Sequence, residues 1–195
     1  MIFFSILITI FAYFLGSISS AILICKILRF PDPRNFGSKN PGATNILRIA
    51  GLKIAISVIL FDILKGAIPM WLGYHLKISP IFLGATAVFS CLGHMYPIFF
   101  KFYGGKGVAT AFGVLTTIDL HLSIVMISSW TLTVLSFGYS SLGAIVTAFI
   151  IPCYAWHFQS QYLLPTIIIS SLVVIKHAAN IKRLWHHKEN RIWRK

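Results

Sequence analysis

Acidic residues are scarce in this chain of 195 residues. Asp and Glu together number 4, against 17 Lys and Arg, so that the formal net charge is +13 at pH 7. The four acids are Asp32, Asp62, Asp119 and Glu189. They are widely separated in the sequence, and a Mg²⁺ or two-metal phosphotransfer site needs several carboxylates together. We therefore expect no bound metal and no other cofactor.

Charged residues of either sign are also few. They make up 11% of the chain, whereas 57% is hydrophobic and the mean hydropathy is +0.82. This composition excludes an ordinary soluble domain and indicates an integral membrane protein. Residues 1–16 lack the charged region and the small-residue cleavage site of a secretory signal, so we interpret them as the first permanent span.

Cysteine provides no framework for disulfides or metal binding. Cys25, Cys91 and Cys153 are odd in number, far apart and without a CxxC pair, which favours buried thiols. The chain also shows no fixed-period repeat and no low-complexity linker. We expect a single polytopic membrane domain over residues 1–195.

Positive charges form three blocks, at residues 26–53, 101–106 and 176–195, and only Lys65 and Lys77 lie outside them. In a soluble protein this much basic charge would indicate nucleic-acid binding. In a membrane protein the positive-inside rule places such blocks in the cytoplasm. We therefore expect the lipid bilayer as a partner, and no nucleic acid.

Basic blocks on one side of a membrane must be separated by an even number of spans. Residues 54–100 contain two apolar stretches, and residues 107–175 allow two or four. Polar interruptions at 117–121, 137–141 and 156–161 divide this stretch and favour four short spans. We expect an all-α integral membrane protein with seven transmembrane helices, a periplasmic N-terminus and a cytoplasmic C-terminus. Five helices are the alternative, and residues 107–118 are few enough for a re-entrant helix.

The segment RFPDPRNFGSKNPGATNILRIAG, residues 29–51, concentrates polar side chains in the first basic block. Its three glycines and three prolines specify an irregular backbone. Side chains that form hydrogen bonds lie among them: Ser38, Asn40, Thr44, Asn45 and Arg48. A solvated surface loop has little need of such backbone specification, so we favour a binding role.

A second cluster is YGGKGVAT, residues 103–110. It is not a nucleotide-binding Walker A loop, because Gly107 follows Lys106 where Ser or Thr is required. Gly104, Gly105 and Gly107 allow backbone N–H groups to approach an anion, and a helix that starts near Gly107 adds its positive end. Taken alone, a flexible turn with a positive-inside lysine explains these residues equally well.

The third cluster is KHAANIKRL near the C-terminus. His177, Asn180 and Leu184 have the spacing of one helical face, which would direct the imidazole and the amide to the cytoplasmic mouth of the bundle. A histidine at a membrane boundary is ordinarily an interfacial residue whose ring nitrogens have hydrogen-bond partners and no catalytic role. Beside Asn180 and two further polar clusters, His177 becomes a candidate for catalysis.

Asp62 and Lys65 lie three residues apart inside an apolar stretch. Unpaired charges are costly within a membrane, so we expect these two residues to form a structural ion pair.

The three clusters together indicate a cationic, glycine-lined active site at the cytoplasmic face, suited to a phosphorylated substrate and a lipid-like one. A membrane transporter or channel for a phosphorylated small molecule is the alternative. Such a protein would carry polar positions across the bilayer, whereas here they gather on one face.

These segments resemble, in order, the bacterial acyl-phosphate:glycerol-3-phosphate acyltransferases, the PlsY family. The segments that resemble the cytoplasmic motifs of this family are residues 16–26 with 37–51, 93–113 and 177–190, and FDILKG at 61–66 matches a further stretch. The resemblance implies transfer of an acyl group from acyl phosphate, rather than from acyl-CoA or acyl carrier protein, to the sn-1 hydroxyl of glycerol 3-phosphate. Lysophosphatidic acid and inorganic phosphate are the implied products, in the first step of phospholipid synthesis at the bacterial inner membrane. A functional link to an enzyme that forms acyl phosphate is also implied.

The resemblance further implies roles for the polar residues. Ser38, Arg48 and Lys106 would hold phosphate groups, and Gly104, Gly105 and Gly107 would offer backbone donors. The polar pocket would be completed by Thr44, Asn45, His177 and Asn180. Acyl phosphate is already activated, so no protein nucleophile is required. The proton of the attacking hydroxyl passes either to a substrate phosphate oxygen or to His177 as general base.

Three positions depart from the family pattern. Ser19 stands where proline is usual, and Lys39 and His187 stand where glycine is common. None of these departures replaces an expected ligand, so they affect the local shape of the backbone. Lys39 would add a further phosphate contact.

Overall fold

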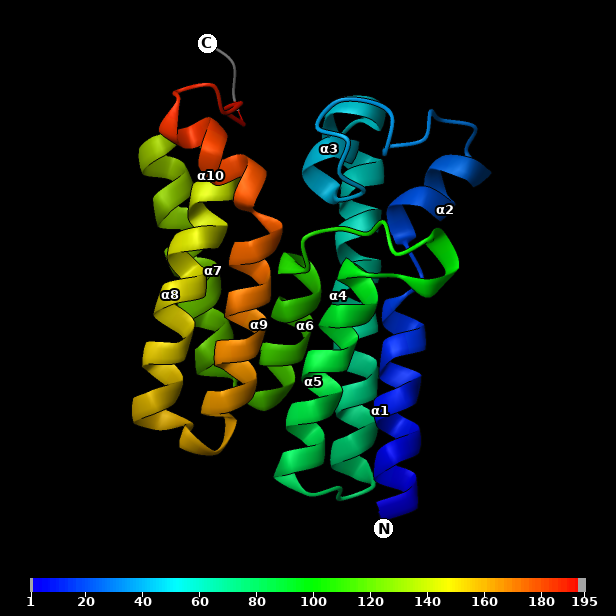
Figure 1. Cartoon of the computed structure of the whole chain (residues 1–195), viewed down its shortest axis with the longest axis vertical. Helices are drawn as coiled ribbons and strands as arrows, with labels where there is room; N and C mark the ends of the chain where they lie inside the picture. The colour runs from blue at the N-terminus through cyan, green and yellow to red at the C-terminus, as the bar shows by residue number, and fades with distance from the viewer. Residues whose placement is uncertain (1, 193–195) are drawn as a thin grey trace. The chain divides into compact units, whose positions relative to one another are not determined.

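The computed structural model describes residues 2–192, which form ten α-helices and two short 3-10 helices and contain no strand (Figure 1). Met1 of the first predicted span, and Arg194 and Lys195 of the third basic block, lie outside the described residues. The α-helices are α1 Ile2–Gly16, α2 Ser20–Ile27, α3 Ala43–Ala50, α4 Leu52–His75, α5 Pro80–Met95, α6 Val108–Ile118, α7 Leu120–Phe137, α8 Ser140–Phe158, α9 Leu163–Lys176 and α10 Ala178–Trp185. The 3-10 helices are η1 Ile98–Phe100 and η2 Ser160–Tyr162. The prediction of an all-α protein is confirmed.

The helix lengths are those of a multi-pass membrane protein. Within residues 2–192, four helices are long and apolar enough to cross a membrane, namely α4, α5 with η1, α7 and α8. The number rises to six if the bent pairs α1–α2 and α9–α10 each count as one span. α6 has 11 residues, or about 16 Å of helix, against a hydrocarbon core of about 30 Å. The three predicted interruptions between residues 107 and 175 are confirmed as helix boundaries.

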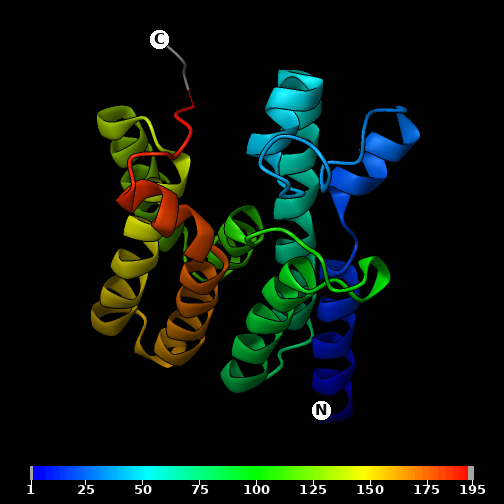
Figure 2. The ribbon, with the colours of Figure 1, turned by 45° about the horizontal axis from the view of Figure 1, so that its top comes forward.

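The chain divides into two compact units, Met1–Thr117 and Ile118–Lys195. The single domain over residues 1–195 stays a prediction. In the first unit, α1 packs along α5, and α4 packs on both. The segment from α2 to α3 lies at the end of this unit that is remote from the N-terminus, and the loop before α6 lies beside the break between α1 and α2 (Figure 2).

Glycines bring the helices of the first unit into close contact. A Cβ atom on Gly93 of α5 would overlap the carbonyl oxygen of Tyr13 in α1. Likewise, a Cβ atom on Gly113 of α6 would overlap the carbonyl oxygen of Ile63 in α4, and one on Gly66 of α4 would overlap that of Thr110 in α6. Small residues allow this approach of helix backbones, which is a common way to pack helices within a membrane.

The second unit is formed by α7, α8 and α9 with the shorter α10. A hydrogen bond of 2.9 Å between the hydroxyls of Ser129 and Thr147 joins α7 to α8. Asp119 caps α7 by accepting from the backbone N–H of His121, and it also accepts from the Gln159 amide at the end of α8. The start of α7 is thereby fixed to the end of α8.

Three α-helices are followed by a basic residue in the left-handed conformation. These residues are Arg29 after α2, Lys77 after α4 and His187 after α10, with φ of 58°, 51° and 54°. After α10 the backbone N–H of Lys188 donates to the carbonyl of Arg183 at 2.8 Å, the bond that defines a Schellman motif. The side chains of Arg29 and Lys77 carry the positive charge that suits a helix C-terminus, although glycine would suit the backbone of all three residues better.

Candidate functional site

Asn45 holds the shape of the first polar segment. Its side chain is buried in α3, and its amide nitrogen donates to the carbonyls of Pro33 and Phe36 at 2.9 and 3.0 Å. Its Oδ1 accepts from the backbone N–H of Ser38 at 2.9 Å. Asn45 was predicted as a pocket residue, and the structure shows that its side chain organises the loop that presents Ser38.

The other predicted residues of this segment are accessible. Ser38, Thr44 and Arg48 are exposed, and Asn40 is partly buried. Thr44 and Arg48 lie four residues apart in α3, so they share one face of this helix. Ser38 and this face therefore present polar atoms that an anionic ligand can reach.

The acid of this segment is neutralised locally. Asp32 receives hydrogen bonds from Arg34, with 2.7 Å between Nη2 and Oδ2. These bonds from the Arg34 guanidinium lower the pKa of Asp32 below its ordinary value. Because Asp32 is engaged with Arg34, it does not cancel the positive charge of Arg48 for an anion.

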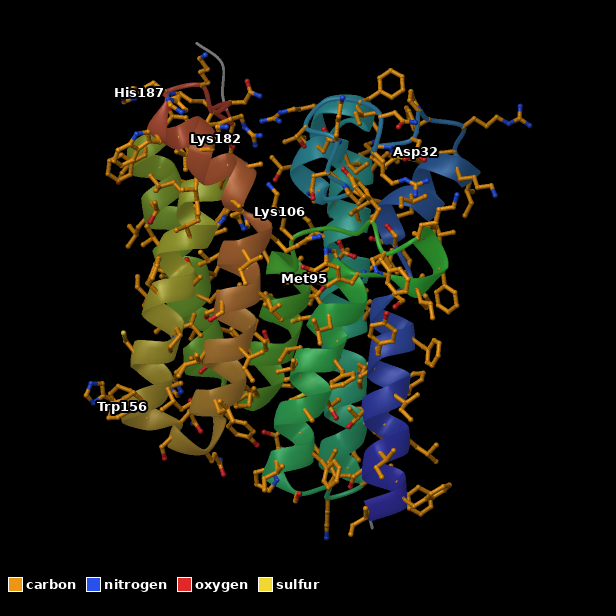
Figure 3. The ribbon with its side chains drawn as sticks, viewed as in Figure 1. Asp32, Met95, Lys106, Trp156, Lys182 and His187 are labelled. Atoms are coloured by element: carbon orange, nitrogen blue, oxygen red, sulfur yellow. The ribbon has the colours of Figure 1, made fainter. Side chains whose placement is uncertain are left out.

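The glycine loop follows η1 and leads into α6. Gly104, Gly105 and Gly107 are buried and Lys106 is partly buried. Gly107 has φ of 80°, and a Cβ atom at this position would also overlap the methyl group of Met95, which lies near Lys106 (Figure 3). α6 begins at Val108, as predicted. Its first backbone N–H groups adjoin Lys106, which is the arrangement of an anion-binding loop.

His177 lies at the junction of two helices in the second unit. α9 ends at Lys176 and α10 starts at Ala178, with a bend of 57° between them. This corrects the expectation that His177 belongs to a regular helical face. The ring Nδ1 lies 2.7 Å from the carbonyl of Val173. A carbonyl only accepts, so in this contact the proton is on Nδ1.

Asn180 belongs to a cluster centred on Glu189. Its amide donates to Glu189 Oε1 at 2.6 Å, the Ser141 hydroxyl donates to the same oxygen at 2.9 Å, and Arg183 Nε donates to Oε2 at 2.6 Å. Burial raises the pKa of Glu189, but the hydrogen bonds from Asn180, Arg183 and Ser141 outweigh it, so the pKa lies below its ordinary value. Sequence reasoning missed this role of Glu189 and Ser141. The available signal was a single acid in a strongly basic tail.

The ion pair predicted between Asp62 and Lys65 is confirmed. Lys65 Nζ lies 2.9 Å from Asp62 Oδ1, and both side chains are buried.

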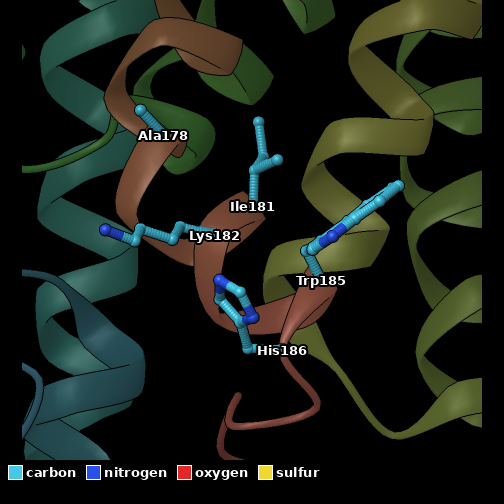
Figure 4. Close-up of a pocket in the computed structure, with 5 residues that line it drawn as sticks. All are labelled: Ala178, Ile181, Lys182, Trp185 and His186. Atoms are coloured by element: carbon cyan, nitrogen blue, oxygen red, sulfur yellow. The ribbon is translucent and has the colours of Figure 1, made fainter.

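A shallow pocket of about 340 Å³ lies along α10 of the second unit (Figure 4). Its lining residues are Ala178, Ile181, Lys182, Trp185 and His186. None of these was predicted as a site residue.

The helices and these clusters define an integral membrane protein whose accessible arginine, glycine loop and neighbouring lysine suit a phosphate-bearing ligand. A family model described as glycerol-3-phosphate acyltransferase matches residues 6–187. The chain is 57% identical to a glycerol-3-phosphate acyltransferase of Blochmanniella floridana over 192 residues, which cover 98% of each chain. It is also 57% identical to one of Yersinia pestis (strain Pestoides F) over 186 residues, 95% of this chain and 86% of the relative. The chain belongs to the glycerol-3-phosphate acyltransferase family.

Two solved structures are similar to the chain. One is PlsY (YgiH), described as an integral membrane glycerol 3-phosphate acyltransferase in its glycerol 3-phosphate form, with a TM-score of 0.91 and 37% identity over 96% of this chain and 94% of the other. The other is the lysophosphatidic acid form of PlsY, with a TM-score of 0.89, 36% identity and the same coverage. The family resemblance predicted from the motifs is confirmed.

Proposed function

We propose that this protein transfers an acyl group from acyl phosphate to the sn-1 hydroxyl of glycerol 3-phosphate. The observation that carries the proposal is membership of the glycerol-3-phosphate acyltransferase family over nearly the whole chain. The similar structures in glycerol 3-phosphate and lysophosphatidic acid forms support the acceptor and the product. The motif resemblance and the basic, acid-poor surroundings of Arg48 and Lys106 support acyl phosphate as the donor. The product enters phospholipid synthesis, and an enzyme that forms acyl phosphate must supply the donor.

The reaction is a direct acyl transfer. The hydroxyl oxygen attacks the acyl carbonyl carbon, the bond from this carbon to the phosphate oxygen breaks, and phosphate leaves with the electron pair. The donor is an activated mixed anhydride, so catalysis consists of positioning and of stabilising charge. The hydroxyl proton passes either to a phosphate oxygen of a substrate or to His177.

In the first unit, we assign Ser38, Arg48 and Lys106 to phosphate binding. Gly104 and Gly107 of the glycine loop supply further backbone N–H donors, whereas the N–H of Gly105 donates to the carbonyl of His94 at 3.1 Å and fixes the path of the loop. Asn40 and Thr44 add polar contacts beside them, and Asn45 acts by fixing the backbone at Ser38.

In the second unit, His177 and Asn180 contribute polar groups to the reaction. Glu189 holds Asn180 by accepting from its amide at 2.6 Å.

The topology that fits this chemistry has seven membrane segments, with α6 as a short one. The positive-inside rule then places the N-terminus in the periplasm and the C-terminus in the cytoplasm of the bacterial inner membrane. Both substrates would be bound at the cytoplasmic face, where the basic blocks lie.

The test is transfer of labelled glycerol 3-phosphate into lipid by purified protein supplied with acyl phosphate as donor. We expect labelled lysophosphatidic acid. Absence of product from folded protein would contradict the proposed function.

A further inference from the structure

Asp62 and Lys65 fill the break between α1 and α2. Lys65 Nζ donates to the carbonyl of Ile18 at 3.0 Å, and the Ser20 hydroxyl donates to Asp62 Oδ1 at 2.8 Å. The cation therefore lies at the carbonyl end of α1, and the carboxylate lies at the N–H end of α2. Each charge has the sign that the adjacent helix dipole favours. The ion pair thus stabilises the bend of 45° between these helices.

The same carboxylate adjoins His94 of α5. His94 Nδ1 lies 3.5 Å from Asp62 Oδ1, and the side chains are 6% and 3% exposed. The ring is buried among close-packed neighbours, which restrict it to few orientations. The His94 side chain is therefore fixed in position and links α5 to the Asp62–Lys65 pair.

The glycine loop lies directly on His94. The backbone N–H of Gly105 donates to the carbonyl of His94 at 3.1 Å. A Cβ atom on Gly105 would overlap Nε2 of the His94 ring and would lie 2.9 Å from its Cε1. A Cβ atom on Gly104 would overlap the carbonyl oxygen of His94. Both the ring and the main chain of His94 thus determine the path of the residues that lead to Lys106.

We propose that His94 is a positioning residue for phosphate binding, which holds the loop 104–107 so that Lys106 and the loop N–H groups meet the phosphate of a substrate. This proposal rests on the function assigned to the loop above. His94 acts through the loop, and Asp62 acts through His94. The ion pair expected to be purely structural thereby becomes part of the support of the site.

The first test removes the ring. In His94→Ala we expect the KM for glycerol 3-phosphate or for acyl phosphate, whichever the loop holds, to rise about tenfold or more, because small displacements of a binding group are costly. His94→Asn keeps a donor near Asp62 and is expected to recover part of the loss. Cys91→Ala is the matched control, since Cys91 is buried one turn earlier on α5. It is expected to keep wild-type KM values.

The second test uses the contact with Gly105. Gly105→Ala is expected to be impaired because its methyl group meets the His94 ring. In the His94→Ala background this space is vacant, so the double variant is expected to be more active than Gly105→Ala alone. Such non-additivity is the signature of residues in direct contact.

Affinity for inorganic phosphate, measured by thermal stabilisation of the detergent-solubilised protein, is independent of turnover. We expect weaker phosphate binding in His94→Ala than in wild type. A folded His94→Ala protein with wild-type KM values and wild-type phosphate affinity, or an additive double variant, would overturn the proposal. A wild-type protein that binds phosphate but forms no lysophosphatidic acid would contradict the proposed function, and the role of His94 would then be decided by phosphate affinity alone.

Discussion

Asn180 and Glu189 are joined by a hydrogen bond of 2.6 Å between the side-chain amide and Oε1. The carboxylate also accepts from Ser141 in α8 and from Arg183 in α10. One acid therefore connects the C-terminal segment to two helices. It holds in place an amide that we assign to the reaction.

Glu189→Ala is expected to lower the free energy of unfolding by about 1–3 kcal/mol, because it leaves several partly buried donors without their acceptor. The measurement is thermal or denaturant unfolding in detergent. The pKa of Glu189 is lowered in the folded protein, so its stabilisation is present above the ordinary glutamate pKa and is lost as pH falls through the lower folded value. The wild type should therefore lose more stability on acidification below about pH 4.3 than Glu189→Ala. Equal losses would contradict this role.

Asn45→Ala is expected to reduce activity through the loop. The substitution leaves the backbone N–H of Ser38 and two carbonyls without their partner, at a cost of about 1–3 kcal/mol, so the KM for a phosphate substrate should rise. Asn35→Ala in the same segment is the control, since Asn35 is exposed. Equal kinetics for the two variants would show that Asn45 does not shape the site.

His187→Gly is expected to stabilise the protein by about 1 kcal/mol, because His187 has φ of 54° and glycine adopts this conformation without strain. His186→Gly is the matched control. His186 is the neighbouring residue and has φ of −91°, so glycine there should destabilise. Melting temperatures of both variants measure the difference, and a lower value for His187→Gly would be inconsistent with a strained C-cap.

His177→Gln distinguishes the two proton acceptors. If a substrate phosphate accepts the proton, the variant should retain near-normal turnover at saturating substrate. A loss of about 100-fold or more in kcat, within the usual contribution of a general base, would favour His177 instead. The variant's melting temperature must match that of wild type for the comparison to hold.

Lys106→Ala and Arg48→Ala are each expected to lose most of the activity while the protein stays folded. Removal of one positioned charged donor typically costs about 100-fold or more in rate. Lys101→Ala is a control from the same basic block, because Lys101 is exposed and is assigned no role. If Lys106→Ala and Lys101→Ala had equal activity, the assignment of the loop to phosphate binding would be wrong.

Composition and local pattern predicted most of the fold. Polar interruptions marked the ends of α6, α7 and α8, because helices break where the apolar stretch is interrupted. The bend at residues 17–19 was not predicted, since it depends on Lys65 and Asp62, which come from another helix. The junction at His177 was missed because the sequence around it is compatible with a continuous helix.

The sequence predicted which polar residues form the candidate site, but not which atoms their side chains contact. Asn45 was recognised as polar and placed in the pocket, whereas its actual contacts are backbone atoms of residues 33–38, which only the folded loop brings to it. Glu189 was not recognised because its partner Ser141 is 48 residues away. The departures Lys39 and His187 did carry structural information, since both have the positive φ that glycine would favour.

The most direct test of the account is the stoichiometry of products with each donor. Purified protein is incubated with labelled glycerol 3-phosphate and either acyl phosphate or acyl-CoA, and lysophosphatidic acid and inorganic phosphate are measured in the same reaction. We predict equimolar lysophosphatidic acid and phosphate with acyl phosphate, and no lysophosphatidic acid with acyl-CoA. Lysophosphatidic acid formed only with acyl-CoA, or phosphate released without lysophosphatidic acid, would contradict the account.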